Sequence, residues 1–205
     1  MSKTKSSSSK RWLHEHNSDV YVKRAHQEGY RARSVYKLQE IQAIHKILKP
    51  GMVVVDLGAA PGGWSEFVAK TIGKSGKVFA VDILSMQPIA GVEFIHGDFT
   101  DPKIVNALSQ RIGGAEVDAV LSDMAPNLSG CSVTDQARSL ELLEAALVFA
   151  KKFLKLKGIF LCKAFQGAEL IKFTNELRKN FSTVKIIKPP ASRSRSKEIF
   201  LLAQN

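Results

Sequence analysis

Short apolar runs alternate along the chain with longer stretches in which apolar residues recur every three or four positions. The short runs predict seven strands, at 53–57, 78–82, 92–98, 117–122, 159–163, 183–187 and 199–203. The periodic stretches predict helices over 34–48, 64–72, 101–112, 134–154 and 167–180. Strands that alternate with helices are typical of an α/β domain. We therefore expect a doubly wound, mostly parallel seven-stranded sheet with helices on both faces.

The first strand runs into a glycine-rich turn, Asp56-Leu57-Gly58-Ala59-Ala60-Pro61-Gly62-Gly63-Trp64. A strand, a tight turn and a helix form the nucleotide-binding corner of a doubly wound sheet. Ala60 stands where a dinucleotide fold needs a second glycine, and Pro61 has no amide donor, so the corner suits pyrophosphate poorly. Asp82, at the end of the next strand, lies where ribose hydroxyls are held. These features favour a nucleoside without phosphates, such as S-adenosylmethionine; another adenine cofactor, or none, is the alternative.

The net charge of +11 is concentrated at the two ends of the 205-residue chain. Residues 1–37 hold nine Lys and Arg against three acids, and 182–205 hold five against one, whereas 38–181 are nearly neutral. Two basic flanks around a neutral core suit a polyanion, with RNA as the leading candidate. Solvated tails are the plainer alternative.

Length and composition predict one domain at 21–205, preceded by a flexible basic tail at 1–20 that is rich in Ser and Lys. The two cysteines form neither a metal-binding spacing nor a disulfide framework, so we expect no metal and a reducing cytoplasm. The sequence has no apolar run of membrane-spanning length and no signal-peptide core, and we expect no membrane association.

Two features near the expected ligand admit a second interpretation. The tyrosines among the basic residues of 11–36 can stack on unpaired bases, or can dock a terminal helix on the core. Asp98, followed by Phe99, can meet an adenine base, or can cap the next helix.

Charged residues mark the ends of three predicted strands. Asp123 follows the fourth strand, Lys163 ends the fifth, and Glu198 precedes the last, which we expect to be antiparallel. These three would then meet at one sheet edge beside the glycine turn, where they suit methyl transfer to a hydroxyl, with a neutral lysine accepting the proton. A structural ion-pair cluster is the alternative. Lys37, at the margin of a helical stripe, is by its pattern a surface residue.

Four motifs together resemble the FtsJ/RlmE-type ribosomal RNA 2′-O-ribose methyltransferases, from about Tyr21 to the last residue. The motifs are Tyr30-Arg31-Ala32-Arg33-Ser34-Val35-Tyr36-Lys37-Leu38, the glycine turn, Ser122-Asp123-Met124-Ala125-Pro126-Asn127, and Ser192-Arg193-Ser194 through Lys197-Glu198. The resemblance implies a Rossmann-like S-adenosylmethionine-dependent methyltransferase fold. It also implies a catalytic tetrad of Lys37, Asp123, Lys163 and Glu198, in which Lys163 is the proton acceptor, Asp123 and Glu198 hold it, and Lys37 places the ribose. The cofactor contacts implied are Asp56, Gly58, Gly62, Trp64, Asp82, Asp98 and Asp123.

The resemblance further implies a substrate and a setting. The expected target is a uridine in the loop of 23S rRNA that receives aminoacyl-tRNA, the A-loop, within the assembled large subunit. We expect a monomer that needs no protein partner. Alternatives are the same chemistry on tRNA or an mRNA cap, a non-catalytic RNA-binding assembly factor, and an NAD-dependent dehydrogenase, which Ala60-Pro61 disfavours.

Overall fold

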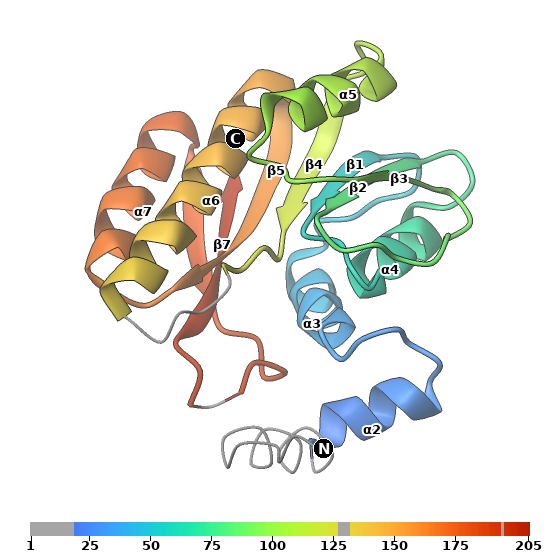
Figure 1. The fold of residues 1–205 in the computed structure, drawn as a ribbon, viewed down its shortest axis with the longest axis horizontal. Coiled ribbons are helices and arrows are strands. Elements are labelled where there is room, and N and C mark those ends of the chain that lie inside the picture. Colours follow the sequence, from blue (N-terminus) through green and yellow to red (C-terminus); the bar gives the residue numbers. More distant parts are fainter. Residues whose placement is uncertain (1–18, 127–131, 194) are drawn as a thin grey trace, which may run out of the picture.

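A single seven-stranded sheet forms the centre of the protein (Figure 1). The computed structural model describes residues 19–126, 132–193 and 195–205. The strands are β1 Val53–Leu57, β2 Lys77–Asp82, β3 Val92–His96, β4 Val117–Ser122, β5 Leu154–Phe165, β6 Thr183–Ile187 and β7 Glu198–Gln204. Their order in the sheet is β3-β2-β1-β4-β5-β7-β6, and β7 runs antiparallel to both of its neighbours while the other pairings are parallel. The predicted fold class is confirmed.

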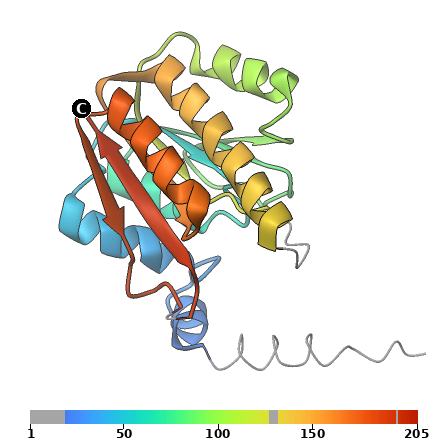
Figure 2. The same ribbon diagram turned by 90° about the vertical axis from the view of Figure 1, so that its left-hand side faces the viewer.

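Helices cover both faces of the sheet, as predicted (Figure 2). They are α2 Val20–Gln27, α3 Val35–His45, α4 Gly63–Ile72, α5 Pro102–Ile112, α6 Ser132–Phe153 and α7 Ala168–Asn180. Helices α3 and α4 pack their apolar stripes on one face, and α5, α6 and α7 pack theirs on the other. Burial of these stripes on the apolar strands supplies most of the stabilising free energy.

Helix α2 lies beside α3 rather than on the sheet (Figure 1). Residues 1–18, most of the expected tail, lie outside the described residues. The side chain of Asp19 caps α2 by accepting a hydrogen bond from the Tyr21 amide at 3.0 Å. Tyr21 and Tyr30 pack against Tyr36, so these rings dock α2 on the core, the second of the two interpretations given above.

The third helix is shorter than its apolar pattern suggested. The prediction of a helix to residue 48 was wrong, because α3 ends at His45 and Lys46 adopts a left-handed conformation (φ 49°). Ile44 is 71% exposed, whereas Leu48 is buried from the loop that follows. The chain thus leaves the helix after His45 and inserts Leu48 into the core from the loop.

The fifth strand is longer than its apolar run. The prediction that it begins at residue 159 was wrong, because β5 starts at Leu154, directly after α6, and pairs there with Val117. The register shifts between this pair and the next, Ala119 with Ile159. Such an irregularity lets the exposed and polar residues before Gly158 join the sheet without an apolar pattern.

The glycine turn after β1 is held close to the end of β4. Gly58 has φ 78°, and the amide of Asp123 donates to the carbonyl of Leu57 at 3.1 Å. A Cβ atom on Gly58 would lie 2.9 Å from the backbone nitrogen of Met124 and 3.0 Å from its Cα. Only glycine therefore allows β1 and β4 to end side by side.

Within the described part of the chain, no helix is long and apolar enough to span a membrane, and no three His, Cys, Asp or Glu residues gather as a metal site. Cys162 is buried in β5 as a free thiol, and burial raises its pKa; Cys131 lies outside the described residues.

Candidate active site

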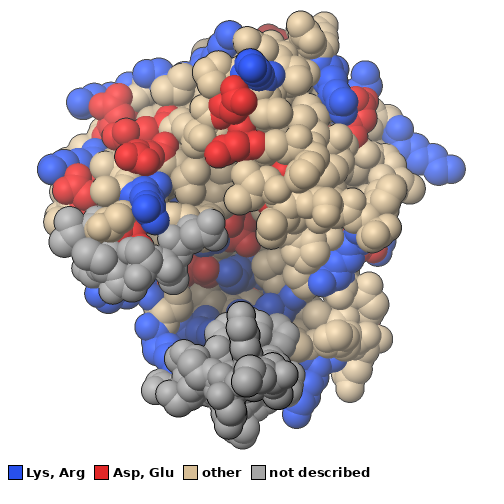
Figure 3. Space-filling model, in the orientation of Figure 1, with Lys and Arg blue, Asp and Glu red and all other residues tan. Residues whose placement is uncertain are grey.

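A cavity of about 460 Å³ opens at the carboxyl ends of β1, β2 and β4. Its lining includes Gly58, Ala60, Asp82, Asp98, Phe99 and Asp123, which come from strand ends and loops at one sheet edge. Ligands of doubly wound sheets bind at this edge, where parallel strands end. Figure 3 shows acidic and basic side chains gathered in a hollow on this view of the molecule.

Asp82 joins the end of β2 to the glycine turn. One of its carboxylate oxygens accepts from the amide of Ala60 and the other from the amide of Leu84, each at 2.8 Å. A carboxylate oxygen has two acceptor lone pairs, so both oxygens retain capacity for a hydroxyl donor. Asp82 is therefore held rigidly and can still bind a ligand.

Asp98 does not cap the helix that follows it. The cap of α5 is Asp101, whose side chain accepts from the amide of Lys103 at 2.9 Å. Asp98 instead accepts from the amide and the hydroxyl of Thr100, and it lines the cavity. Phe99 also borders the cavity, with its ring packed edge-on against Phe149.

Asp56 is buried beneath the cavity rather than exposed in it. Its side chain accepts from the hydroxyl of Ser65 at 2.6 Å, and its other oxygen has no hydrogen-bond partner. Burial, with smaller effects of Asp123 and Asp82, raises the pKa of Asp56 to about 7. This acid thus lies next to the site and changes charge near neutral pH.

The Trp64 side chain packs away from the cavity. Its ring lies 5.6 Å from that of Phe200 in the core, and its Nε1 donates to the carbonyl of Ser34 at 2.8 Å. Gly62, at the start of α4, has φ 106°, and a Cβ there would meet Ile89. Neither Gly62 nor Trp64 lines the cavity of the described structure, so both remain predicted cofactor contacts.

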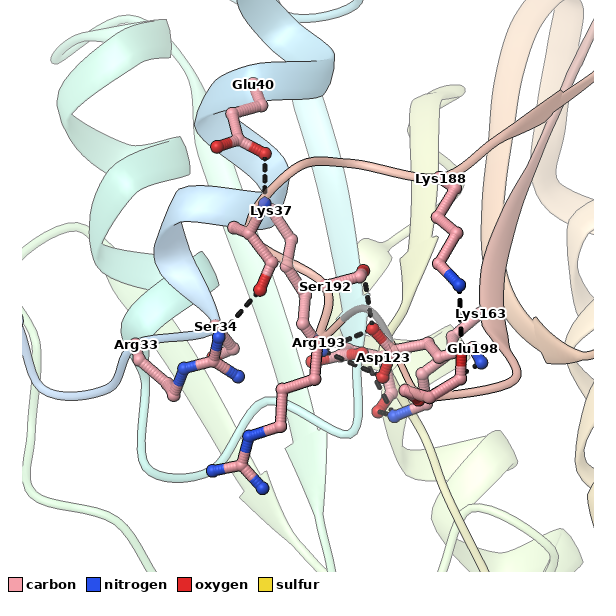
Figure 4. A network of polar contacts seen from close by, with 12 residues as sticks. Arg33, Ser34, Lys37, Glu40, Asp123, Lys163, Lys188, Ser192, Arg193 and Glu198 are labelled. Carbon is pink, nitrogen blue, oxygen red and sulfur yellow. Dashed lines mark hydrogen bonds and ion pairs between the residues drawn. The ribbon is translucent and has the colours of Figure 1, made fainter. Parts of the chain in front are cut away.

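The four expected catalytic side chains form two ion pairs at the same edge (Figure 4). Lys163 Nζ lies 2.5 Å from the carbonyl oxygen of Asp123 and 3.0 Å from its carboxylate. Lys37 Nζ lies 2.7 and 2.8 Å from the two carboxylate oxygens of Glu198. The side chain of Lys163 is 7% exposed and that of Lys37 10%. Lys37 is therefore not the surface residue that its pattern indicates.

Strand register brings the two pairs together. In the pairing of β5 with β7, Lys163 lies opposite Phe200 and Phe165 lies opposite Glu198. Directly opposed residues share a face of the sheet, so Lys163 and Glu198 are diagonal neighbours on one face. Lys37 Nζ is 5.7 Å from the centre of the Phe200 ring, which shares that face. The antiparallel last strand thus produces the expected convergence, although the ion-pair partner of Glu198 is Lys37.

Sequence reasoning missed several residues around the site. Arg138 and Glu141 line the cavity from α6, on a helix whose leucines alone gave a signal. Ser192 donates to Glu198 at 3.0 Å; it stands in the last of the four motifs, but no role was predicted for it. Arg33 and Glu40 contact the backbone of Ala191, and no sequence pattern connects residues so far apart.

The model of one family, described as FtsJ-like methyltransferase, matches residues 30–205. The chain belongs to this family. It is therefore a methyltransferase, and the expectation raised by the four motifs is confirmed.

Curated relatives support the same assignment. The chain is 53% identical over 194 residues to ribosomal RNA large subunit methyltransferase E of Azoarcus sp. (strain BH72), covering 95% of each chain. It is 52% identical over 201 residues to the protein of the same name from Xanthomonas campestris pv. campestris (strain B100), covering 98% of this chain and 96% of the relative. A crystal structure of a Plasmodium falciparum protein described as a ribosomal RNA methyltransferase superposes with a TM-score of 0.78 at 27% identity, covering 86% of this chain and 98% of that chain.

Proposed function

We propose that this protein transfers the methyl group of S-adenosylmethionine to the 2′-hydroxyl of a uridine ribose in the A-loop of 23S rRNA, within the large ribosomal subunit. The observation that carries the proposal is Lys163, a buried amine held by Asp123, a residue that also lines the cavity. An amine so placed can take a proton from a hydroxyl that reacts at the mouth of the cavity.

The cavity fits a nucleoside cofactor without phosphates. Its volume lies within the range of about 300–1,000 Å³ usual for ligand pockets. The amide of Ala60 is already bonded to Asp82, and Pro61 has no N–H, so neither residue can donate to a pyrophosphate. The acids Asp82, Asp98 and Asp123 suit the ribose hydroxyls, the base amino group and the positive charges of S-adenosylmethionine. When bound, this cofactor supplies a methyl group activated by a positively charged sulfur.

The protein's own groups then have to orient a hydroxyl and remove its proton. With the cofactor bound, Lys163 in its neutral form would accept the proton that the 2′-hydroxyl loses when its oxygen takes the methyl group. The carboxylate and carbonyl of Asp123 stabilise the ammonium that results. Lys37, fixed by Glu198 on the same face, is placed to orient the ribose.

The choice of RNA rests on the relatives and on charge. The curated relatives are named ribosomal RNA large subunit methyltransferase E. The described parts of the two basic ends, α2 and the loop 188–197, lie together beside the ion pairs (Figure 1), and Arg193 bonds there to Asp19, the cap of α2. Basic side chains that flank the reactive edge would bind RNA phosphates on both sides of the target nucleotide. The proposal includes a monomer in the cytoplasm without a protein partner, which sedimentation tests. It also includes a flexible tail ahead of a single domain, which proteolysis tests; the end of the tail lies before Asp19 and not at residue 20, because Asp19 caps α2 and pairs with Arg33.

The test uses radiolabelled S-adenosylmethionine with intact large subunits, naked 23S rRNA, tRNA and capped RNA as separate substrates, followed by mapping of the 2′-O-methylated nucleotide. Label confined to one A-loop uridine in large subunits supports the proposal. Label on tRNA or cap would refute the substrate, and tight binding of a dinucleotide in its place would refute the cofactor.

The Lys163→Ala variant tests the mechanism. We expect methyl transfer to fall by about 10²-fold or more, as for loss of a general base, with cofactor and RNA binding kept. Lys155→Ala is the matched control, because Lys155 is also in β5 and is paired with an acid, Asp118, near the other end of that strand. A Lys163→Ala variant as active as Lys155→Ala would exclude Lys163 as the proton acceptor. If the wild type binds RNA but transfers no methyl group to any of these substrates, the result would favour a non-catalytic assembly factor.

A further inference from the structure

The carboxylate of Glu198 is oriented by a loop, 188–197, that α2 and α3 hold in place. We propose that Glu40 is a positioning residue: it fixes this loop through Ala191, so that Ser192 and Glu198 hold the ammonium of Lys37 where the ribose must be placed. This inference rests on the proposed function. Glu40 acts through the loop and not on the substrate.

The loop determines the surroundings of Glu198. Ser192 donates its hydroxyl proton to one carboxylate oxygen of Glu198 at 3.0 Å, and that oxygen also lies 2.7 Å from Lys37 Nζ. The backbone amide of Glu198 donates to the hydroxyl of Ser196 at 3.1 Å. The side-chain carboxylate and the backbone amide of Glu198 are therefore both hydrogen-bonded to serines of the loop. A shift of the loop would remove a partner from the carboxylate that orients Lys37.

Glu40 fixes the loop one residue before Ser192. Ala191 is fully buried, and its amide donates to Glu40 at 2.8 Å while its carbonyl accepts from Arg33 at 2.6 Å. The second carboxylate oxygen of Glu40 accepts from the hydroxyl of Tyr21 at 3.2 Å. A buried amide without an acceptor costs free energy, so loss of Glu40 forces Ala191 to move towards water or another acceptor. Figure 4 follows these contacts from Glu40 through Ser192 to Glu198.

A second contact holds the other side of Ser192. Arg193 Nε lies 3.3 Å from a carboxylate oxygen of Asp19, which also lies 3.1 Å from Arg33 Nε. Lys188 Nζ donates to the carbonyl of Ser196 at 2.8 Å and closes the loop on itself. Because the loop is fixed on both sides of Ser192, removal of Glu40 frees the amide of Ala191, while Arg33 still holds its carbonyl and Asp19 still holds Arg193.

The test is a double-mutant cycle in single-turnover methyl transfer. We expect Glu40→Ala to lower the rate of methyl transfer about tenfold at saturating cofactor and subunits, with cofactor affinity unchanged. The reason is that the variant loosens the loop that orients Glu198 and Lys37 but does not alter the cavity. Glu40→Gln should stay within about twofold, since its amide oxygen can still accept from Ala191. In a Glu198→Ala background, adding Glu40→Ala should leave the residual rate unchanged within about twofold, since a residue that acts through Glu198 has nothing left to position.

Glu28→Ala is the matched control. Glu28 is another acid at the junction of α2 and α3, but its two carboxylate oxygens accept from Arg24 and from the hydroxyl of Tyr36 rather than from the loop. We expect it to keep nearly the full rate. An equal fall for Glu28→Ala and Glu40→Ala, or the same fall in the Glu198→Ala background as in wild type, would overturn the proposal.

Hydrogen exchange gives a readout that does not depend on activity. The amides of Ala191, Ser192 and Glu198 should exchange faster in Glu40→Ala than in wild type, and at wild-type rates in Glu28→Ala. Unchanged exchange in Glu40→Ala would overturn the proposal whatever the activity. A wild type inactive on every RNA would refute the proposed function as well, whereas an active wild type with additive cycle energies would refute the positioning role alone.

Discussion

Replacing Gly58 with alanine should damage the cofactor cavity through the backbone of β4. Gly58 has φ 78°, and a conformation of this kind costs a residue with a Cβ about 1–2 kcal/mol. The new Cβ would also lie 2.9 Å from the nitrogen of Met124, which belongs to the backbone and cannot rotate aside. Overpacking of this kind adds about 1–3 kcal/mol, and it displaces Met124, which borders the cavity.

Gly29→Ala separates the two effects. Gly29 has φ 72°, close to that of Gly58, but a Cβ there would meet no atom within 4 Å. Both variants therefore incur the cost of the positive φ, and Gly58→Ala alone incurs the cost of overpacking against Met124. Since 1 kcal/mol shifts the Tm of a domain of this size by about 2–4 °C, Gly58→Ala should melt about 2–12 °C below Gly29→Ala.

Calorimetry supplies both measurements. Scanning calorimetry gives the Tm values, and titration with S-adenosylmethionine gives the affinities. We expect at least about tenfold weaker binding for Gly58→Ala and wild-type binding for Gly29→Ala. Equal melting temperatures for the two variants, with equal affinities, would show that the approach of β4 to the turn does not shape the cavity.

Two further predictions concern buried charge. The pKa of Asp56 is raised to about 7, well above the value of about 3.9 in an unfolded chain, so the folded state binds the extra proton. Its contribution to the free energy of unfolding should therefore fall as pH rises from about 4 to about 7, by about 4 kcal/mol, and the fall should be missing from Asp56→Asn in urea titrations; a constant difference between variant and wild type over this range would contradict it. Lys37→Met should lower the free energy of unfolding by up to about 3–5 kcal/mol because it leaves the largely buried carboxylate of Glu198 without its cationic partner, and adding Glu198→Gln should restore most of the loss. A double variant no more stable than Lys37→Met would contradict the pairing.

The apolar pattern of the sequence predicted the strands that are buried on both faces. The apolar runs of β1 and β4 lie in the middle of a parallel sheet, where both faces are covered, so continuous Val and Leu identify them. The start of β5 at Leu154 could not be found in this way. The residues before Gly158 include exposed lysines, and only the neighbouring β4 makes them a strand.

The residues of the candidate site that lie at strand ends or within the motifs could be predicted from the sequence. Asp123, Lys163 and Glu198 were placed together from strand direction alone, and the register of β5 with β7 puts Lys163 and Glu198 on one face. The pairing of Glu198 with Lys37 was not predictable, because it depends on how α3 lies across the sheet. The burial of Ala191 and Ser192 was not predictable from a loop of basic composition either, because it depends on packing against α2 and α3.

Strand β7 lies between β5 and β6, and it carries Glu198 but does not line the cavity. The cavity is lined from β1, β2, β4 and α6, whereas β7 contributes Glu198 and the Phe200 ring that packs against Trp64. Removal of β7 would also detach β6 from the sheet, since β6 is hydrogen-bonded to β7 at the sheet edge. A chain in which β7 has not yet docked would have the walls of the cavity but would lack Glu198, the partner of Lys37. Under the proposed mechanism, completion of the sheet is thus the step that adds the group orienting Lys37 to a cavity that is already formed.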